Sequence, residues 1–168
     1  MNSKTKEKLK KNSTVIGIDA GTARVGFAIL TLNKIKPKLI EYGLIPINET
    51  QHNLRLKKIY EYIKKLIKKY KPQSVVTERM YYYLNRKTSF EVSQAIGVIN
   101  LACTELKTSL SFVNPTQVKK IITNKGNANK SEIQEKIIST FKLKEKPIDD
   151  VTDAIAIAFA HTKINNHL

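Results

Sequence analysis

The sequence predicts a mixed α/β fold, in which helices flank a five-stranded sheet whose first three strands are antiparallel. Two observations predict it. Three extended segments follow one another between Val15 and Ile47, and after them amphipathic helical segments alternate with short apolar ones. Strands in direct succession join as antiparallel hairpins, whereas strands separated by helices run parallel, so one mixed sheet accommodates both halves of the chain.

The first half of the predicted sheet consists of three segments rich in β-branched and aromatic residues. They read VIGIDA, RVGFAILTL and KLIEYGLIPI. Breaks at Gly21 and at residues 33–37 separate them. We therefore expect an antiparallel meander before the first helix.

The segment after residue 50 predicts an amphipathic helix followed by a strand. Apolar residues recur at helical spacing, lysines take other positions, and Pro72 closes the helix. The apolar positions are Leu56, Ile59, Ile63, Leu66 and Ile67. The short strand SVVT then ends in Glu78.

The rest of the chain predicts four helices and a fifth strand. The strand reads SLSFV, and the helices span residues 88–106, 115–123, 130–141 and 149–163. Small residues in the helix over 88–106 permit close packing, which makes this helix a candidate dimer interface. They are Ser89, Ser93, Ala95, Gly97 and Ala102.

Charge and composition indicate a polyanionic partner. The 168 residues fit one domain, and 30 Lys and Arg against 14 Asp and Glu give a net charge of +16, which favours nucleic acid. We expect residues 1–13 to form a basic, disordered tail and residues 14–168 a single domain. No apolar stretch approaches the length of a membrane span or forms a secretory signal, and Cys103 lies alone in an apolar segment. These features predict no membrane partner, a packed thiol and an intracellular protein, which would be cytoplasmic and nucleoid-associated in a bacterium; a phage or organellar source is left open.

Asp19 and Glu78 each end a predicted strand. Asp19 interrupts the apolar run VIGIDAGTARVGFAI, where an acid is costly to bury unless a partner pairs with it. Asp19 therefore starts a turn, or it holds a cation or a phosphate. Because ligands of such sheets gather at the ends of neighbouring strands, we expect both acids at one site.

Further acids open the last predicted helix. The segment PIDDVTDAIAIAFAH places Asp149, Asp150 and Asp153 at its start, and residues three or four apart share a helical face. Asp149 or Asp150 is also a natural N-cap. Asp153 is surrounded by apolar residues and needs a partner.

Together these acids predict a divalent-metal site. Carboxylate oxygens suit Mg²⁺ or Mn²⁺, and no cysteine or histidine cluster competes for a softer metal. His161 is interpreted as a packed or surface side chain. Hydrolysis of a phosphodiester by two metals about 4 Å apart uses such a set of acids. Because crowded carboxylates repel one another, we expect the metal-free site to bind protons more readily than isolated acids do.

A series of motifs appears in a specific order and spacing: GIDAG, VVTE, SQAIG, VKK, NKSEI and DDVTDAIAIA. Between about residues 15 and 161, the chain thereby resembles the RuvC Holliday-junction resolvases of the RNase H-like superfamily. The resemblance implies an RNase H-like fold and a homodimer that resolves four-way or branched DNA by paired symmetric nicks in DNA recombination and repair. It also implies two Mg²⁺ ions per active site, for which Mn²⁺ substitutes. A branch-migration motor as a further partner is left open.

The resemblance also assigns roles to individual residues. The implied metal ligands and catalytic acids are Asp19, Glu78, Asp150 and Asp153, with Asp149 as an alternative to Asp150. Two further catalytic residues, Lys119 and Lys130, match lysines that lie near the DNA and support cleavage. In the run Tyr81, Tyr82 and Tyr83, Tyr81 or Tyr82 matches an aromatic residue that contacts bases at the junction. Ala20 stands where the family commonly has proline.

Three other classes of function are compatible with parts of the sequence. An RNase H-like nuclease acting on RNA–DNA hybrid, structured RNA or general branched DNA would share the acids. An ATP-binding protein of the actin and sugar-kinase type also has a stretch like GIDAGT, but it needs two lobes and a second phosphate loop. A non-enzymatic DNA-binding protein would explain the charge and would leave the embedded Asp153 without a reason.

Overall fold

The computed structural model describes residues 13–32, 36–80 and 86–166. The helices and strands follow in this order: β1 (Thr14–Asp19), β2 (Gly26–Leu32), β3 (Pro37–Leu44), α1 (His52–Tyr70), β4 (Ser74–Glu78), α2 (Arg86–Glu105), β5 (Ser109–Val113), α3 (Pro115–Thr123), α4 (Lys130–Phe141) and α5 (Asp149–Asn166). No helix within these ranges combines the length and apolar character needed to cross a membrane.

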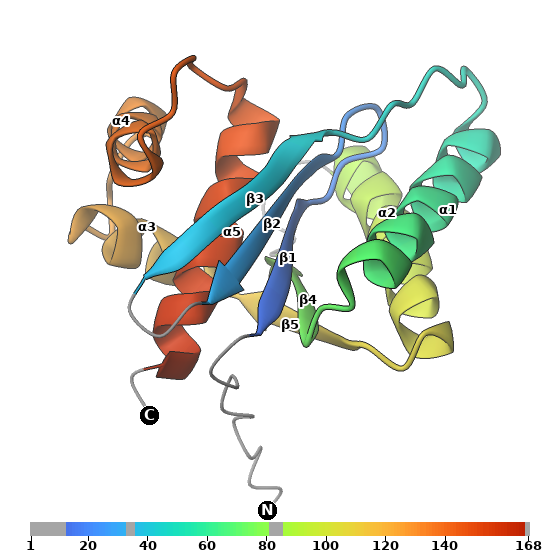
Figure 1. The fold of residues 1–168 in the computed structure, drawn as a ribbon. Coiled ribbons are helices and arrows are strands. Elements are labelled where there is room, and N and C mark those ends of the chain that lie inside the picture. Colours follow the sequence, from blue (N-terminus) through green and yellow to red (C-terminus); the bar gives the residue numbers. More distant parts are fainter. Residues whose placement is uncertain (1–12, 33–35, 81–85, 167–168) are drawn as a thin grey trace, which may run out of the picture.

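The sheet has the predicted mixed topology (Figure 1). Its strand order is β3-β2-β1-β4-β5, with antiparallel pairing between β1, β2 and β3 and parallel pairing of β4 with β1 and β5. The first two strands are slightly shorter or shifted relative to the predicted segments, and β3 ends at Leu44 where Ile47 was expected. The meander and the two parallel additions are therefore confirmed.

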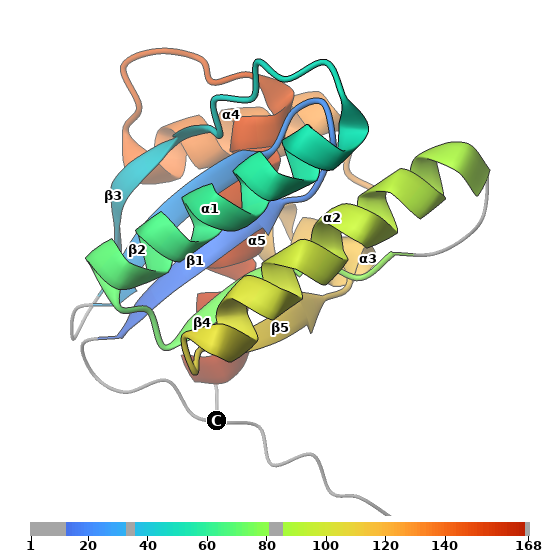
Figure 2. The ribbon, with the colours of Figure 1, turned by 90° about the vertical axis from the view of Figure 1, so that its right-hand side faces the viewer.

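Each face of the sheet has its own apolar core, because consecutive residues of a strand point to opposite sides. Val15 and Val76 project toward α5, whereas Ile16 and Val75 project toward α1 and α2. Figure 2 shows α1 and α2 lying across one face, with α5, α3 and α4 behind the sheet. Cys103 belongs to the core under α1 and α2, where burial raises the pKa of its thiol to about 12, so the predicted packed thiol is confirmed.

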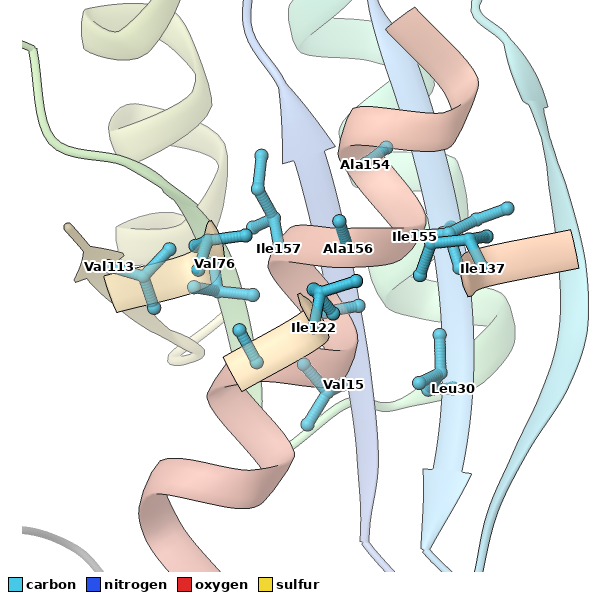
Figure 3. Packing of buried hydrophobic residues seen from close by; sticks show 14 of the residues in the cluster. Val15, Leu30, Val76, Val113, Ile122, Ile137, Ala154, Ile155, Ala156 and Ile157 are labelled. Atoms are coloured by element: carbon cyan, nitrogen blue, oxygen red, sulfur yellow. The ribbon is translucent and has the colours of Figure 1, made fainter. Parts of the chain in front are cut away.

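The helix α5 approaches the sheet very closely at two glycines. A Cβ atom at Gly17 would lie 2.6 Å from the Cβ atom of Ala158, and a Cβ atom at Gly26 would collide with the backbone carbonyl oxygen of Asp150. Side chains from β1, β2, β4, β5, α3 and α4 meet α5 in the cluster drawn in Figure 3. The absence of a side chain at these two positions therefore fixes where the first turns of α5 lie on the sheet.

Candidate active site

Two acids lie side by side at the ends of the central parallel strands. Ile18 of β1 pairs with Thr77 of β4, and Asp19 and Glu78 are the next residues of these strands. Asp19 projects to the same face as Gly17, and Glu78 to the same face as Val76, because side chains alternate along a strand. Both carboxylates are therefore directed toward the face that α5 covers.

The first turns of α5 bring two more acids to this place. Contact with Gly26 holds the backbone of Asp150 against the start of β2. The charges of Asp150 and Asp153 both raise the pKa of Asp19, which places them in its neighbourhood. Asp150 Oδ2 also forms an ion pair with Arg24 Nε, at 3.3 Å. Neither Asp149 nor Asp150 is the N-cap that the sequence suggested, because both lie inside the first turn.

Asp149 differs from Asp150 in exposure and in partner. Its side chain is 60% exposed, against 20% for Asp150, and its Oδ2 atom lies 3.4 Å from Lys130 Nζ. The charges of Asp149 and Asp150 both raise the pKa of Asp153, whereas Asp150 alone of the two raises the pKa of Asp19. Of the two alternatives that the sequence left open, Asp150 is the more buried, and it is the one whose charge acts on Asp19.

Two lysines approach the acids from α3 and α4. Lys130 is the first residue of α4, where a capping box between Asn129 and Glu132 fixes the start of the helix. Its Nζ atom lies 4.0 Å from Asp153 Oδ2. Lys119 of α3 lowers the pKa values of Glu78 and Asp153 through its charge. The structure thus brings both predicted lysines to the acid cluster, which we define as Asp19, Glu78, Asp150 and Asp153.

Burial and mutual repulsion hold protons on this cluster. Burial, followed by the charges of Asp153, Glu78 and Asp150, raises the pKa of Asp19 from 3.8 to about 7. Burial and the charge of Asp153 raise the pKa of Glu78 from 4.5 to about 7. Burial also raises the pKa of Asp153, against the opposing charge of Lys130. These shifts agree with the expectation that the metal-free acids bind protons readily.

The donor set of the cluster fits a divalent cation by its chemistry. Among the residues that the structure describes, no three Asp, Glu, His or Cys side chains converge closely enough to enclose a metal ion. Four carboxylates repel one another when no cation lies between them, and hard divalent cations prefer oxygen ligands of this kind. The residues that would hold such a cation are Asp19, Glu78, Asp150 and Asp153.

A cavity of about 350 Å³ opens beside the two strand-end acids. Asp19 and Glu78 belong to its polar lining, together with Thr77 and Arg79, and its apolar lining includes Val92 and Ile96. The aromatic run Tyr81–Tyr83 directly follows Met80 in the chain and lies outside the described residues. The cavity gives a substrate access to the acids between α2 and the start of α3.

Two contacts of the loop after Asp19 were not predicted. Arg24 pairs with Asp150, and Thr22 Oγ1 donates a hydrogen bond to Glu91 Oε2 of α2 at 3.3 Å. The sequence offered one signal, because Arg24 is a cation only five residues after the first acid.

His161 was expected to be a packed or surface side chain. The structure shows a packed one: His161 is buried at the far end of α5 beside Ser74, away from the acids.

Comparison with known families shows which one the chain belongs to. The family model described as "Crossover junction endodeoxyribonuclease RuvC" matches residues 15–161. The chain belongs to the RuvC family. RuvC from Fusobacterium nucleatum subsp. nucleatum is 40% identical over 149 residues, which cover 88% of this chain and 78% of that protein. RuvC from Brachyspira hyodysenteriae is 39% identical over 151 residues, covering 89% and 94% of the two chains.

Solved structures support the fold of this RuvC family member. "T. thermophilus RuvC in complex with Holliday junction substrate" superposes with a TM-score of 0.84 at 23% identity, covering 92% of this chain and 96% of that one. The yeast mitochondrial Holliday junction resolvase Ydc2 superposes with a TM-score of 0.66 at 15% identity, covering 95% and 84%. The predicted RNase H-like architecture is therefore confirmed. The family makes the chain a nuclease of the crossover-junction class.

Proposed function

We propose that this RuvC family member resolves four-way DNA junctions by metal-dependent hydrolysis of phosphodiester bonds, using Mg²⁺, with two ions per active site. The acid cluster carries the proposal: four carboxylates from two strand ends and one helix start lie near enough to affect one another's pKa values, in a chain of net charge +16. RuvC relatives and the Thermus RuvC structure with its Holliday junction substrate support the choice of substrate.

The residues in and around the acid cluster have different roles in the proposed reaction. Bound to these carboxylates, a divalent metal would lower the pKa of an attacking water and stabilise the leaving oxygen. Lys119 and Lys130 place positive charge where the phosphate approaches, which favours binding of the DNA backbone. Arg24 restrains Asp150 through their ion pair. The cavity beside Asp19 and Glu78 admits the scissile phosphate from the side of α2.

Symmetric cleavage requires two copies of this site, and α2 is the surface that we assign to the dimer. Phe90 and Leu101 of this helix are 65% and 52% exposed, and a Cβ atom added at Gly97 would meet nothing within 4 Å. Exposed apolar side chains next to a gap in the helix surface are suited to close packing of a second copy. The predicted homodimer therefore has an apolar surface available to it.

The test is cleavage of a labelled four-way junction, a linear duplex and an RNA–DNA hybrid, each with and without Mg²⁺. We expect paired nicks at the junction alone, and a loss on the order of 10³-fold for Asp153→Asn. Junction binding should persist in this variant because lysines supply the affinity. Glu135→Gln removes an exposed acid of α4 and should cleave as the wild type does.

The alternative functions predict different results. Cleavage of the hybrid in preference to the junction would assign an RNase H-type activity, and equal cleavage of linear duplex would remove the junction selectivity. Metal-independent binding without cleavage of any substrate would leave a DNA-binding protein. Sedimentation of the wild type as a monomer at the concentration of the cleavage assay would refute the homodimer.

A further inference from the structure

A second hollow lies between α3, α4 and α5, and its volume is about 910 Å³. Apolar side chains of α3 and α5 line part of it: Ile121, Phe159 and Ile164. Lysines of all three helices stand around them: Lys120, Lys136 and Lys163. We call this hollow the lysine-rimmed groove. No Asp or Glu is among its described lining residues, so its charge is positive throughout.

The lysine-rimmed groove is separate from the acid cluster. Phe159 follows Asp153 by six residues of α5, which displaces it by about 9 Å along the helix axis. The helix α3 serves both places, because the charge of Lys119 acts on the acids while the next residue, Lys120, lines the groove. Neither Lys120 nor Lys136 contributes to the pKa shift of Asp19, Glu78 or Asp153.

The positive charge of the groove is not neutralised by the chain itself. Within the described part of the protein, Lys120, Lys136 and Lys163 take part in no ion pair, whereas Lys64, Lys69 and several other lysines do. The Nζ atom of Lys163 instead lies 5.4 Å from the centre of the Phe159 ring. A ligand that suits this groove therefore combines negative charge with apolar side chains.

The positive charge of the lysine-rimmed groove disfavours two occupants that this chain could supply, its own N-terminal tail and a second copy. Residues 1–12 contain five lysines and one glutamate, so this tail would be repelled by the rim. A second copy, which we place on the apolar surface of α2, would bring a net charge of +16 to this rim of lysines, and that charge disfavours its binding here. Duplex DNA presents phosphates, but its polar backbone would leave the apolar floor in contact with water.

We propose that the lysine-rimmed groove binds a segment of another protein, an acidic peptide that also carries branched or aromatic apolar side chains. The carboxylates of such a segment pair with Lys120, Lys136 and Lys163. Its apolar side chains cover Ile121, Phe159 and Ile164. This division of roles, in which an apolar floor gives affinity and a charged rim selects the partner, is typical of peptide grooves.

The experiment measures fluorescence anisotropy of two labelled peptides of about twelve residues, a length that spans a groove of this kind. One alternates Asp with Leu and Phe, and the other replaces Leu and Phe by Ser at the same charge. The test variant is Lys120→Glu with Lys136→Glu. Its control, Lys65→Glu with Lys68→Glu, makes the same change of charge at exposed positions of α1, on the opposite face of the sheet.

We expect the wild type to prefer the apolar peptide, the groove variant to bind it about tenfold more weakly or worse, and the control to stay within about twofold. Circular dichroism should be unchanged in both variants, because all four lysines are exposed. The proposal is overturned if the wild type binds neither peptide, or if it binds both equally. It is also overturned if both double variants lose the same affinity, or if the groove variant selectively loses affinity for a short DNA duplex.

Discussion

Polar side chains are buried at both ends of α5, but their partners and the directions of their pKa shifts differ. At the end of the helix, His161 Nε2 lies 3.0 Å from Ser74 Oγ, and Asn165 Nδ2 donates to the His161 carbonyl oxygen at 3.0 Å. Burial lowers the pKa of His161 to about 4, so the ring is neutral at pH 7. At the start of the helix, burial raises the pKa values of Asp19 and Glu78 to about 7.

The difference lies in what accompanies the buried group. Neutral partners surround His161 and satisfy it, which is the usual arrangement of a structural polar group. Asp19 and Glu78 have other acids as neighbours, and within residues 13–32, 36–80 and 86–166 neither carboxylate accepts a hydrogen bond. Desolvation acts at both ends, so a shifted pKa alone does not identify a functional site. Repulsion between neighbouring acids is the more specific sign, because it persists at Asp19 and Glu78 despite the charges of Lys119 and Lys130, and a bound cation would relieve it.

The sharpest test of this comparison is Asp19→Asn. The amide keeps the shape of the side chain and removes one of the charges that a metal would require. We expect junction cleavage to fall on the order of 10³-fold or more while junction binding is retained. Single-turnover cleavage at saturating Mg²⁺ measures the effect. Cleavage within tenfold of the wild type would show that Asp19 is a buried acid of the fold and no part of the catalytic set.

The second test displaces the start of α5 from the sheet. In Gly26→Ala, the added Cβ atom collides with the carbonyl oxygen of Asp150, a backbone atom that cannot rotate away. We expect a loss of about 3 kcal/mol in the free energy of unfolding, measured by urea denaturation.

The matched control for this substitution is Gly43→Ala. Its Cβ atom would lie 3.5 Å from the Phe27 ring, which is ordinary van der Waals contact, so its free energy of unfolding should stay within about 1 kcal/mol of the wild type. Equal effects of the two substitutions would mean that the close contact at Gly26 does not position α5.

Much of this arrangement is predictable from the sequence, and the missing part has a physical reason. Strand ends and helix starts can be located from hydrophobic periodicity, which is why Asp19, Glu78 and Asp153 were expected together. The choice between Asp149 and Asp150 depends on the rotation of α5 about its axis. That rotation is fixed by packing at Gly17 and Gly26, which is tertiary contact and leaves no periodic signal.

Contacts between side chains of distant segments were likewise beyond sequence reasoning. The ion pair of Arg24 with Asp150 joins residues separated by more than 100 positions, and the Thr22–Glu91 hydrogen bond joins a loop to α2. Nothing in the local pattern of either segment specifies its partner. The lysine-rimmed groove is a similar case, because its residues are ordinary amphipathic positions until three helices bring them together.

The third test uses pH to separate the two ends. Because the pKa values of Asp19 and Glu78 rise on folding, from 3.8 and 4.5 to about 7, the folded state binds more protons than the unfolded state between about pH 4 and 7. Their contribution to stability is therefore lost as pH rises through this window. Asp19→Asn removes the part of this loss of stability that comes from ionising Asp19. Without metal, its free energy of unfolding in urea should therefore exceed that of the wild type at pH 8, by on the order of 1–3 kcal/mol. At pH 4 the two proteins should show almost no difference.

Mg²⁺ supplies the control for this pH dependence. A cation that binds the ionised acids stabilises the wild type at pH 8 more than at pH 5, and it should have little effect on Asp19→Asn. A wild type whose stability at pH 8 is unaffected by Mg²⁺ would contradict the assignment of the acids as a cation site. A difference between variant and wild type that does not change with pH would show that Asp19 ionises normally in the folded state.

The smallest effect is expected at the other end of α5. Ser74→Ala removes the hydroxyl beside His161 and should cost about 1 kcal/mol of stability, since the ring loses one hydrogen-bond partner in a buried site. Ser139→Ala, at an exposed position of α4, should change stability by less than about 0.5 kcal/mol. Cleavage and its pH profile should be the same in both variants as in the wild type, because the hydroxyl of Ser74 contributes to none of the shifted acids. A shifted pH profile in Ser74→Ala would mean that the satisfied end of α5 and the acidic end are coupled through the helix, and the division between a structural and a functional end would no longer hold.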